Sequence, residues 1–374
     1  MQTLLPILIA SLFFAYLTEV TTYGKYGQAR QFSVNKLFFC CLLLTLAFPV
    51  GLRTYYNDTW NYISGFQISP SLRALLASGE LSLMQNPAFL VYRSLVRSFT
   101  DNYHIFLFIP ALFVQYAYIV FIRRYSPSFT LGIAIYFLFG GFVFSLAAMK
   151  QTIAMAILLF SVPQLLEKKY VRFYLLVFIS FLFHTYAIAF AIMPLFTVKP
   201  WSIPTFLLLA VTVFVMTSFE SVITAFLDAA NETGKTVAEY EVFDNNQINI
   251  IRVLVYAVVP LASLVLNSIL FSGTYNKDYN LLIHMSIFAF AFMLLGTING
   301  ANMFGRMASY FDFGIICSLP WIIKKAFEPR SAKLVYISAI VCFFIYFFYA
   351  NHINTHFDSQ YQSITLIDFI VTLF

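Results

Sequence analysis

Long apolar runs recur along this chain and constrain its fold more than any other feature. An apolar stretch of about 18 residues or more can cross the hydrocarbon core of a bilayer as one helix. Lipid offers no hydrogen bonds to an open sheet edge, so these runs predict helices. We expect an all-α polytopic membrane protein with about 10–12 transmembrane helices in a single integral membrane domain over residues 1–374. The apolar runs cover, approximately, residues 3–19, 36–52, 104–122, 128–147, 151–166, 171–196, 203–219, 250–271, 280–298, 303–323 and 333–350.

The composition excludes an ordinary water-soluble domain. Charged residues make up only 10% of the chain and hydrophobic residues 61%, whereas soluble domains carry about 25% charged residues. The net charge of +6 comes mostly from Lys and Arg in short loops, so we interpret it as a topology signal rather than a nucleic-acid surface. The cysteines lie inside apolar runs and predict buried structural thiols, with no disulfide and no metal site. They are Cys40, Cys41, Cys317 and Cys342.

Basic loops predict the orientation, because Lys and Arg are usually in excess on the cytoplasmic side. Placing four basic clusters inside puts the N-terminus outside, together with loops at about 53–102 and 220–249. The clusters are Lys25 with Arg30 and Lys36, Arg123 with Arg124, Lys168 with Lys169 and Arg172, and Lys324 with Lys325, Arg330 and Lys333.

One segment conflicts with simple counting of helices. The acidic loop 220–249 can lie outside only if residues 171–219 cross the membrane an odd number of times. We therefore expect a broken or re-entrant helix near His184 or around Pro194, Pro200 and Pro204. Broken backbone at membrane depth is tolerated where it lines a cavity or packs against protein, so we expect a cavity beside this segment.

The outer loop 53–102 is expected to carry interfacial helices. Asn86 followed by Pro87 is typical of a helix start, with Asn capping and Pro at the first helical position. Arg93 and Arg97 follow on one helix face, which predicts an amphipathic helix on the membrane surface. These arginines could contact lipid phosphates or form a solvated polar face, and the sequence leaves both alternatives open.

A few ionisable residues near or inside the apolar runs are candidates for chemistry, since such residues are costly in a membrane. Arg53, Asp58, Lys150 and Arg306 are expected at one level, the outer headgroup boundary, while His184 lies deeper. Three cations and one carboxylate on one face would suit an anion such as a pyrophosphate. Asp58 or His184 could act as general base on a sugar hydroxyl.

Structural alternatives exist for each of these residues. The cations could anchor helix ends at the headgroups, and Asp58 could be a turn residue. Arg306 at a helix start would oppose the helix dipole, which favours a functional reason for it. We interpret two further residues within later apolar runs, His284 and Asp312, as mainly structural.

Four short motifs, in order along the chain, resemble the EpsG family. Gly51-Leu52-Arg53 with Asn57-Asp58-Thr59-Trp60-Asn61-Tyr62 resembles a GLR…D…Y stretch that follows the second helix in that family. Lys150-Gln151-Thr152-Ile153-Ala154 resembles its RQxIA segment, and Phe181-Leu182-Phe183-His184 its lFH segment. Asn302 to Arg306, then Tyr310-Phe311, resembles its N…R…YF segment. Two departures are that Lys150 stands where Arg is expected and Asn86 near where relatives often carry Glu.

The resemblance implies a Wzy-type polymerase of O-antigen, capsule or exopolysaccharide at the outer face of the bacterial inner membrane. Such a glycosyltransferase joins undecaprenyl-pyrophosphate-linked repeat units without metal or other cofactor, and a GT-C-like arrangement is one form its fold could take. Arg53, Lys150 and Arg306 would bind the pyrophosphate, and His184 or Asp58 would be catalytic. Substrate contacts could come from Arg93, Arg97, Trp60 and Tyr62, although the aromatic residues are equally typical of an interface belt. A chain-length regulator is a partner that this function would allow.

Two other activities and a scaffold stay open at this point. A glycan ligase would use the same chemistry with another acceptor. A flippase or transporter for the lipid-linked unit would often show paired halves and a site at mid-membrane, and no repeat between halves is visible here. A scaffold without chemistry would tolerate replacement of Arg53, His184 and Arg306.

Overall fold

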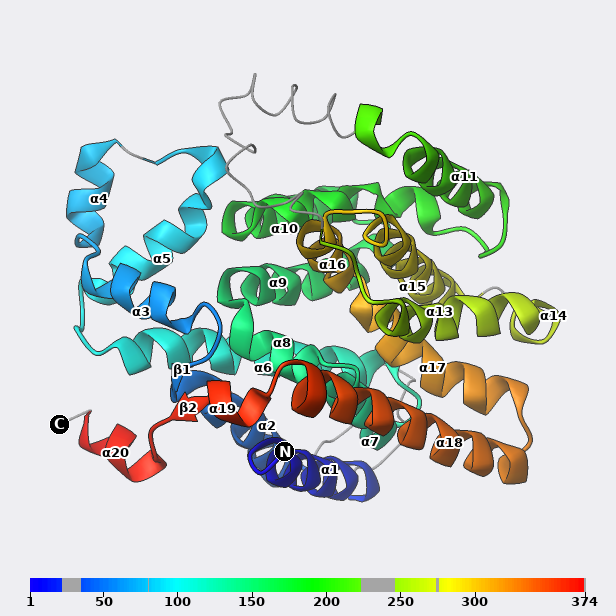
Figure 1. Cartoon of the computed structure of the whole chain (residues 1–374), viewed down its shortest axis with the longest axis horizontal. Coiled ribbons are helices and arrows are strands. Elements are labelled where there is room, and N and C mark those ends of the chain that lie inside the picture. The colour runs from blue at the N-terminus through cyan, green and yellow to red at the C-terminus, as the bar shows by residue number, and fades with distance from the viewer. Residues whose placement is uncertain (22–34, 80, 223–245, 274–275, 373–374) are drawn as a thin grey trace. The chain divides into compact units, whose positions relative to one another are not determined.

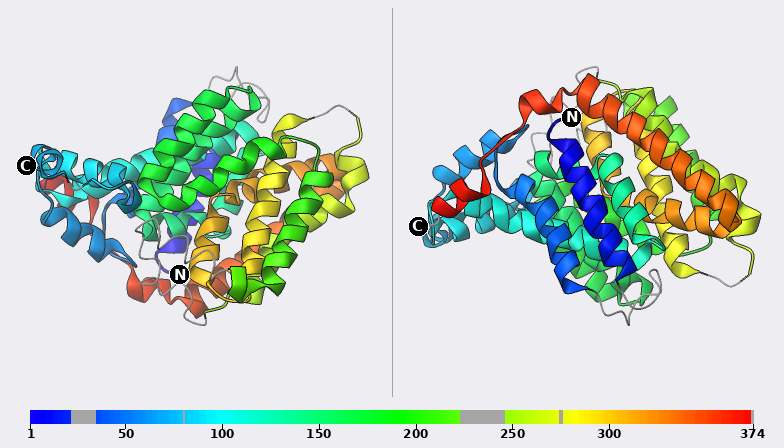
Figure 2. Two further views of the ribbon diagram at one scale, coloured as in Figure 1. Left: turned by 90° about the horizontal axis from the view of Figure 1, so that it is seen from above. Right: turned by 90° about the horizontal axis from the view of Figure 1, so that it is seen from below.

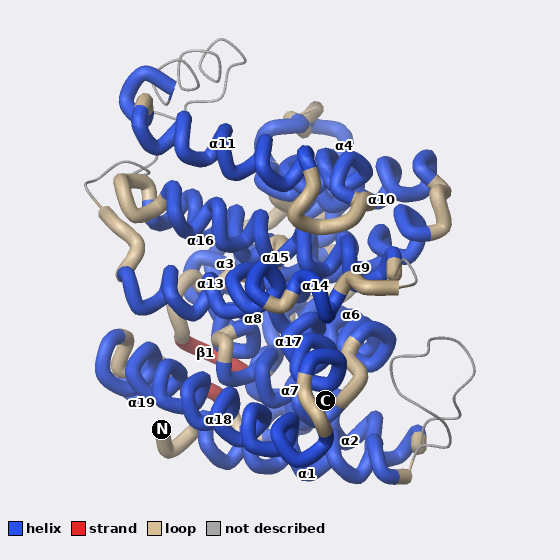
Figure 3. The backbone as a smooth tube through the Cα atoms, turned by 90° about the vertical axis from the view of Figure 1, so that its right-hand side faces the viewer, coloured by secondary structure: helices blue, strands red, loops and turns tan. Residues whose placement is uncertain are grey.

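Helices make up nearly all of the described chain in this computed structural model, as Figure 3 shows. The described residues are 1–21, 35–79, 81–222, 246–273 and 276–372. Within them the strands are β1 (Arg53–Tyr55) and β2 (Gln362–Ser363), which pair antiparallel. The all-α polytopic fold is therefore confirmed. The basic residues Lys25 and Arg30 and most of the acidic loop, 223–245, lie outside the described residues.

The chain divides into two compact units, Met1–Ile188 with Pro329–Phe374, and Ala189–Glu328. Whether they form one integral domain stays a prediction. The helices of the first unit, in chain order (Figure 1), are α1 (Leu4–Val20), α2 (Lys36–Gly51), α3 (Thr59–Gln67), α4 (Leu72–Ser78), η1 (Leu83–Gln85), α5 (Pro87–Arg97), α6 (Tyr103–Tyr125), α7 (Phe129–Leu138), α8 (Gly141–Ala147), α9 (Met149–Leu166), α10 (Tyr170–Phe183), α18 (Pro329–Phe348), η5 (Tyr349–Asn354), α19 (Phe357–Gln360) and α20 (Leu366–Val371).

The second unit is also helical. The 3-10 helix η2 (Thr185–Phe196) runs across the boundary between the units. The remaining helices are α11 (Ile203–Thr217), α13 (Ile250–Val265), α14 (Asn267–Leu270), α15 (Lys277–Leu295), α16 (Ala301–Ser309) and α17 (Asp312–Ala326).

Several helices have the length and composition to cross a membrane. Among the described residues there are 4 such helices: α6, α9, α15 and the continuous segment Pro329–Asn354. If the bent pair of α7 and α8 is counted as one span, there are up to 5 such spans. Shorter apolar helices, such as α1 and α2, are also present. The chain is thus a multi-pass membrane protein, whereas the expected number of about 10–12 crossings stays a prediction.

Several of the apolar runs are broken in the structure, and three of the breaks bear on the predictions. The run 128–147 bends by 52° between α7 and α8, where Gly140 has φ 103°, a conformation that glycine adopts without steric cost. The run 171–196 breaks at His184, so the expected break is confirmed there. The run 303–323 was predicted as one helix, which is wrong, because the chain turns at Tyr310 between α16 and α17.

Close helix packing holds the first unit together. Gly51 ends α2 directly against the backbone of Phe108 in α6, and a Cβ there would lie 2.9 Å from the Phe108 Cα. Near this contact, the rings of Phe48 and Phe108 stack at 5.4 Å. Antiparallel α9 and α10 are joined by a hydrogen bond of 2.7 Å from the Ser180 hydroxyl to the Ala154 carbonyl. Figure 2 shows α1 lying alongside α2, with which it packs.

The lipid-facing surface is visible in the exposed apolar residues. On α18, Leu334, Ile337 and Ile345 are exposed, as expected for a helix that faces acyl chains. All four cysteines are free in the structure. The prediction that they are buried is wrong for Cys40 and Cys342, which lie on the exposed faces of α2 and α18.

Candidate functional site

Arg53 lies at the floor of a site in the first unit. It follows α2 directly, in β1, and its Nε donates a hydrogen bond of 3.0 Å to the Thr59 hydroxyl at the start of α3. Its Nη1 donates to the Val50 carbonyl. The residue is only 1% exposed, so it is buried within protein and does not face water, as a residue open to the outer headgroup boundary would.

Burial leaves part of the Arg53 guanidinium unsatisfied. Among the described residues, its Nη2 has no hydrogen-bond partner. The side chain lines a small cavity of about 10 Å³ together with Met149 and Thr152 of α9. Such a volume is close to the minimum needed for one water. Desolvation lowers the pKa of Arg53 to about 10, against the opposing effect of the Tyr62 and Tyr361 phenols. The group therefore remains cationic at neutral pH.

Next to Arg53 lies a charged group that consists of Lys150, Asp58 and Arg93. Lys150 is the second residue of α9, and the charges of Arg93 and Asp58 both act on its ammonium. Its Nζ also lies 5.0 Å from the centre of the Phe89 ring. The structure thus brings Asp58, Lys150 and Arg93 together. Arg53 lies next to this group, because it contacts Thr59 and lines a cavity with Met149, the chain neighbours of Asp58 and Lys150.

The start of α9 itself favours an anion. Ala148 precedes this 18-residue helix and offers no side-chain oxygen to cap its first backbone N–H groups. A helix N-terminus carries partial positive charge, and Lys150 in the first turn opposes that dipole. A bound anion would relieve this conflict, since helix N-termini and cations together form anion sites.

Helix α5 differs partly from its expected form. It begins at Pro87 as predicted, but Asn86 is left-handed with φ 53° and caps through no side-chain hydrogen bond. Arg93 is turned inward, since a Cβ on Gly65 of α3 would lie 2.9 Å from its Nη1. Burial lowers the pKa of Arg93, and its Nε is buried without a hydrogen-bond partner.

Arg97 has partners of its own. It forms an ion pair with the exposed Asp101, and its guanidinium lies 5.8 Å from the centre of the Phe66 ring. The two arginines of α5 therefore have different surroundings. Arg93 belongs to the charged group. Arg97 is paired with Asp101, which makes it a weaker candidate for a substrate contact.

His184 lies at the end of α10, where the helix breaks. Its backbone is extended and its ring lies 5.1 Å from that of Tyr186. Because Ser180 contacts Ala154 across the antiparallel pair, the C-terminal end of α10 is at the same end of the pair as Lys150. His184 is thus placed toward the charged group.

The aromatic candidates separate by exposure. Trp60 is 62% exposed, so its indole face is available to a sugar or to lipid headgroups. Tyr62 is buried and its ring packs 5.9 Å from that of Phe89. The expectation of a sugar contact at Tyr62 is therefore not supported, because its ring face is covered by protein.

Arg306 and two structural candidates belong to the second unit. Arg306 lies in the last turn of α16, so the expected conflict with the helix dipole is wrong. His284 is fully buried, with Nδ1 2.9 Å from the Asn280 carbonyl and Nε2 2.9 Å from the Thr205 hydroxyl. A carbonyl only accepts, so Nδ1 carries a proton and donates to it. This agrees with a structural role.

Asp312 opens α17 as a buried carboxylate. It interacts with the Tyr256 hydroxyl and with the charge of Arg252, which lies 5.8 Å from the Tyr256 ring centre. Arg252 was not singled out from the sequence. Its place in the first turn of an apolar helix was the available signal.

Comparison with known proteins gives one finding. A sequence model of the EpsG family matches residues 36–364. No curated protein and no solved structure matches the chain. The matched range begins at α2 and includes Arg53, Lys150, His184 and Arg306, and it ends just after β2.

Proposed function

Because the chain belongs to the EpsG family, and so to polysaccharide biosynthesis, we propose that it is a Wzy-type polymerase. Its donor would be a glycan on undecaprenyl pyrophosphate, and its acceptor another lipid-linked repeat unit. The reaction would take place at the outer face of the bacterial inner membrane, where the charged group of the first unit would open.

The reaction needs a base and a site for the leaving group. The acceptor hydroxyl oxygen forms a bond to the anomeric carbon of the donor sugar, and the bond from that carbon to the diphosphate oxygen breaks. The hydroxyl proton passes to Asp58 or His184 as general base. The lipid diphosphate leaves with added negative charge, which nearby cations stabilise.

One observation carries this proposal: Lys150 and Arg93 share a group with Asp58 at the uncapped start of α9. Lys150 and Arg93 would hold the diphosphate, together with the first amides of α9. Arg53 would stabilise the diphosphate charge without contacting it, because water screens the field of a buried cation less than that of an exposed one. Trp60 is exposed nearby in α3 and would offer a stacking face to a sugar.

The test is a reconstituted assay with purified lipid-linked repeat units, with product length as readout. Wild-type protein should give a ladder, and Lys150→Ala should lower kcat/KM by about 10²-fold or more, as for loss of a group that stabilises the leaving charge. Lys333→Ala is the matched control, because Lys333 is an exposed lysine of α18. A Lys150→Ala ladder equal to wild type would refute the assignment.

Two further outcomes discriminate the alternatives. In cells, a deletion that leaves single-unit caps supports a polymerase, whereas total loss of attached glycan supports a ligase.

The role of Arg306 as a diphosphate ligand is proposed on its match to the family motif. If Arg306→Ala gives ladders of wild-type length, that residue has no part in the reaction.

A further inference from the structure

The C-terminal segment of the chain returns to cover the Arg53 loop. Strand β2 pairs with β1, so that Arg53 lies opposite Ser363, and the Ile364 amide donates to the Leu52 carbonyl at 3.1 Å. These residues are some three hundred positions apart in the sequence. Figure 1 shows β1, β2 and α19 next to one another. We name residues 357–372 the C-terminal strap.

Tyr361 is the strap residue that closes over Arg53. Its hydroxyl donates a hydrogen bond of 2.8 Å to the Pro49 carbonyl in the last turn of α2, and the charge of Arg53 acts on its phenol. Its ring packs against those of Tyr56 and Phe357, at 6.5 and 5.2 Å. Tyr361 therefore contacts the loop on both sides of Arg53.

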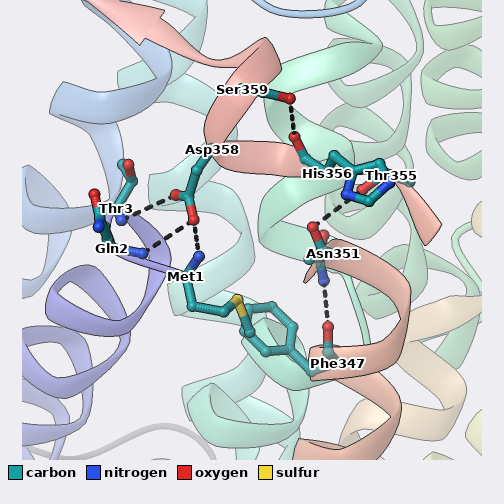
Figure 4. Close-up of polar contacts among 9 residues, drawn as sticks. All are labelled: Met1, Gln2, Thr3, Phe347, Asn351, Thr355, His356, Asp358 and Ser359. Atoms are coloured by element: carbon teal, nitrogen blue, oxygen red, sulfur yellow. Dashed lines mark hydrogen bonds and ion pairs between the residues drawn. The ribbon is translucent and has the colours of Figure 1, made fainter. Parts of the chain in front are cut away.

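The strap is also attached at its two ends. At one end the Asp358 carboxylate accepts from the Gln2 and Thr3 amides at 3.0 and 3.1 Å and pairs with the Met1 amine (Figure 4). At the other end the side-chain amide of Asn102 donates to the Thr372 backbone carbonyl at 3.0 Å. Two attachments outside the middle contact hold the strap over the loop.

We propose that Tyr361 is a positioning residue for the reaction, which keeps Arg53 fixed and dry beneath the strap. The guanidinium has an unpartnered Nη2 and is 1% exposed, so its cover decides how much water screens it. Exclusion of water strengthens the field of a fixed charge. The effect of Tyr361 on turnover rests on the proposed function, whereas the cover itself does not.

The cover is tested by chemical labelling of arginines with phenylglyoxal, followed by mass spectrometry of the full chain in detergent. Arg53 should be protected in wild type, while exposed Arg73 is the labelled reference. Tyr361→Ala should raise Arg53 labelling about tenfold by opening the strap locally. Thr372→Ala is the control: it keeps the backbone carbonyl that accepts from Asn102, so the far attachment stays and Arg53 should remain protected. Unchanged Arg53 labelling in Tyr361→Ala would overturn the proposal.

The functional half is tested by a double-mutant cycle on kcat/KM. Tyr361→Phe keeps the ring and removes the hydroxyl, and we expect about tenfold lower kcat/KM from it in an otherwise wild-type chain. In an Arg53→Gln background the same change should have no further effect, because both act through one group. Additive losses would mean a merely structural role and overturn the positioning assignment. An inactive wild type would instead refute the proposed function, and the labelling result would still decide the cover.

Discussion

A methyl group at Gly51 should force α2 away from α6. Gly51 is the last residue of α2 and the first of the Gly51-Leu52-Arg53 motif. A Cβ there would lie 2.9 Å from the Phe108 Cα and 3.1 Å from its Cβ. The ring edge of Phe108 would lie closer still, but it is part of a side chain, whereas the Cα belongs to the backbone and cannot move aside by a side-chain rotation.

The cost of Gly51→Ala follows from this geometry. Carbon pairs rest at about 3.5–4.0 Å, so the helices must separate by about 0.5–1 Å at this point. Overpacking of this kind costs about 1–3 kcal/mol, and the better helix propensity of Ala returns at most about 1 kcal/mol. We therefore expect a net loss of about 1–2 kcal/mol, together with a shift of Arg53 two residues further along.

The assay is reversible unfolding of the purified protein in mixed micelles with increasing denaturing detergent. Gly305→Ala is the matched control, because a Cβ there would lie 3.5 Å from its nearest neighbour, an ordinary contact. Gly51→Ala should unfold earlier than wild type and the control should not. If Gly51→Ala unfolds with the wild-type midpoint and keeps full activity, the close approach of α2 and α6 does not hold the Arg53 loop.

Other substitutions separate the site from the scaffold. Gly65→Ala would meet only the flexible end of Arg93, so stability should change by less than about 0.5 kcal/mol while the KM for the lipid-linked donor rises; an unchanged KM would place Arg93 outside the site. His284→Phe removes two buried hydrogen bonds and should cost about 1–3 kcal/mol in the same unfolding assay, whereas a neutral result would contradict the satisfied-core interpretation. Glu19→Gln weakens the carboxylate that accepts from the first amides of α7 at 3.1 and 2.8 Å, so we expect a loss of about 1 kcal/mol; no change would show that this cap is screened.

Local signals predicted much of this fold. The apolar runs, the helix start at Pro87 and the break near His184 each depend on a few neighbouring residues, and all are present in the structure. Helix length and breaks follow from backbone rules that act over a few residues. Such features can be inferred from one sequence because no distant segment has to be known.

Contacts between distant segments could not be predicted. The burial of Arg53 depends on β2, which approaches from the far end of the chain, and no pattern around either strand specifies that register. From the sequence, Arg53 at the end of an apolar run was therefore expected at the outer headgroup boundary. The same limit explains why the contact of Tyr361 with the Arg53 loop was not predicted, since no local motif marks this residue. It also explains why the turn at Tyr310 was missed, because the apolar run has no Pro or Gly at that position.

The buried charge of Arg53 destabilises the fold unless an opposite charge compensates it. A buried guanidinium usually has a carboxylate partner, since an uncompensated buried charge costs several kcal/mol. Within the part of the chain that the structure describes, the hydrogen bonds of Arg53 go to two neutral oxygens, those of Val50 and Thr59, and its Nη2 has no partner. Lys150 and Arg93 add further positive charge nearby, with Asp58 as the carboxylate of the group. A scaffold would be more stable with an apolar side chain in place of Arg53, so the excess of positive charge is best explained by an anionic ligand that compensates it.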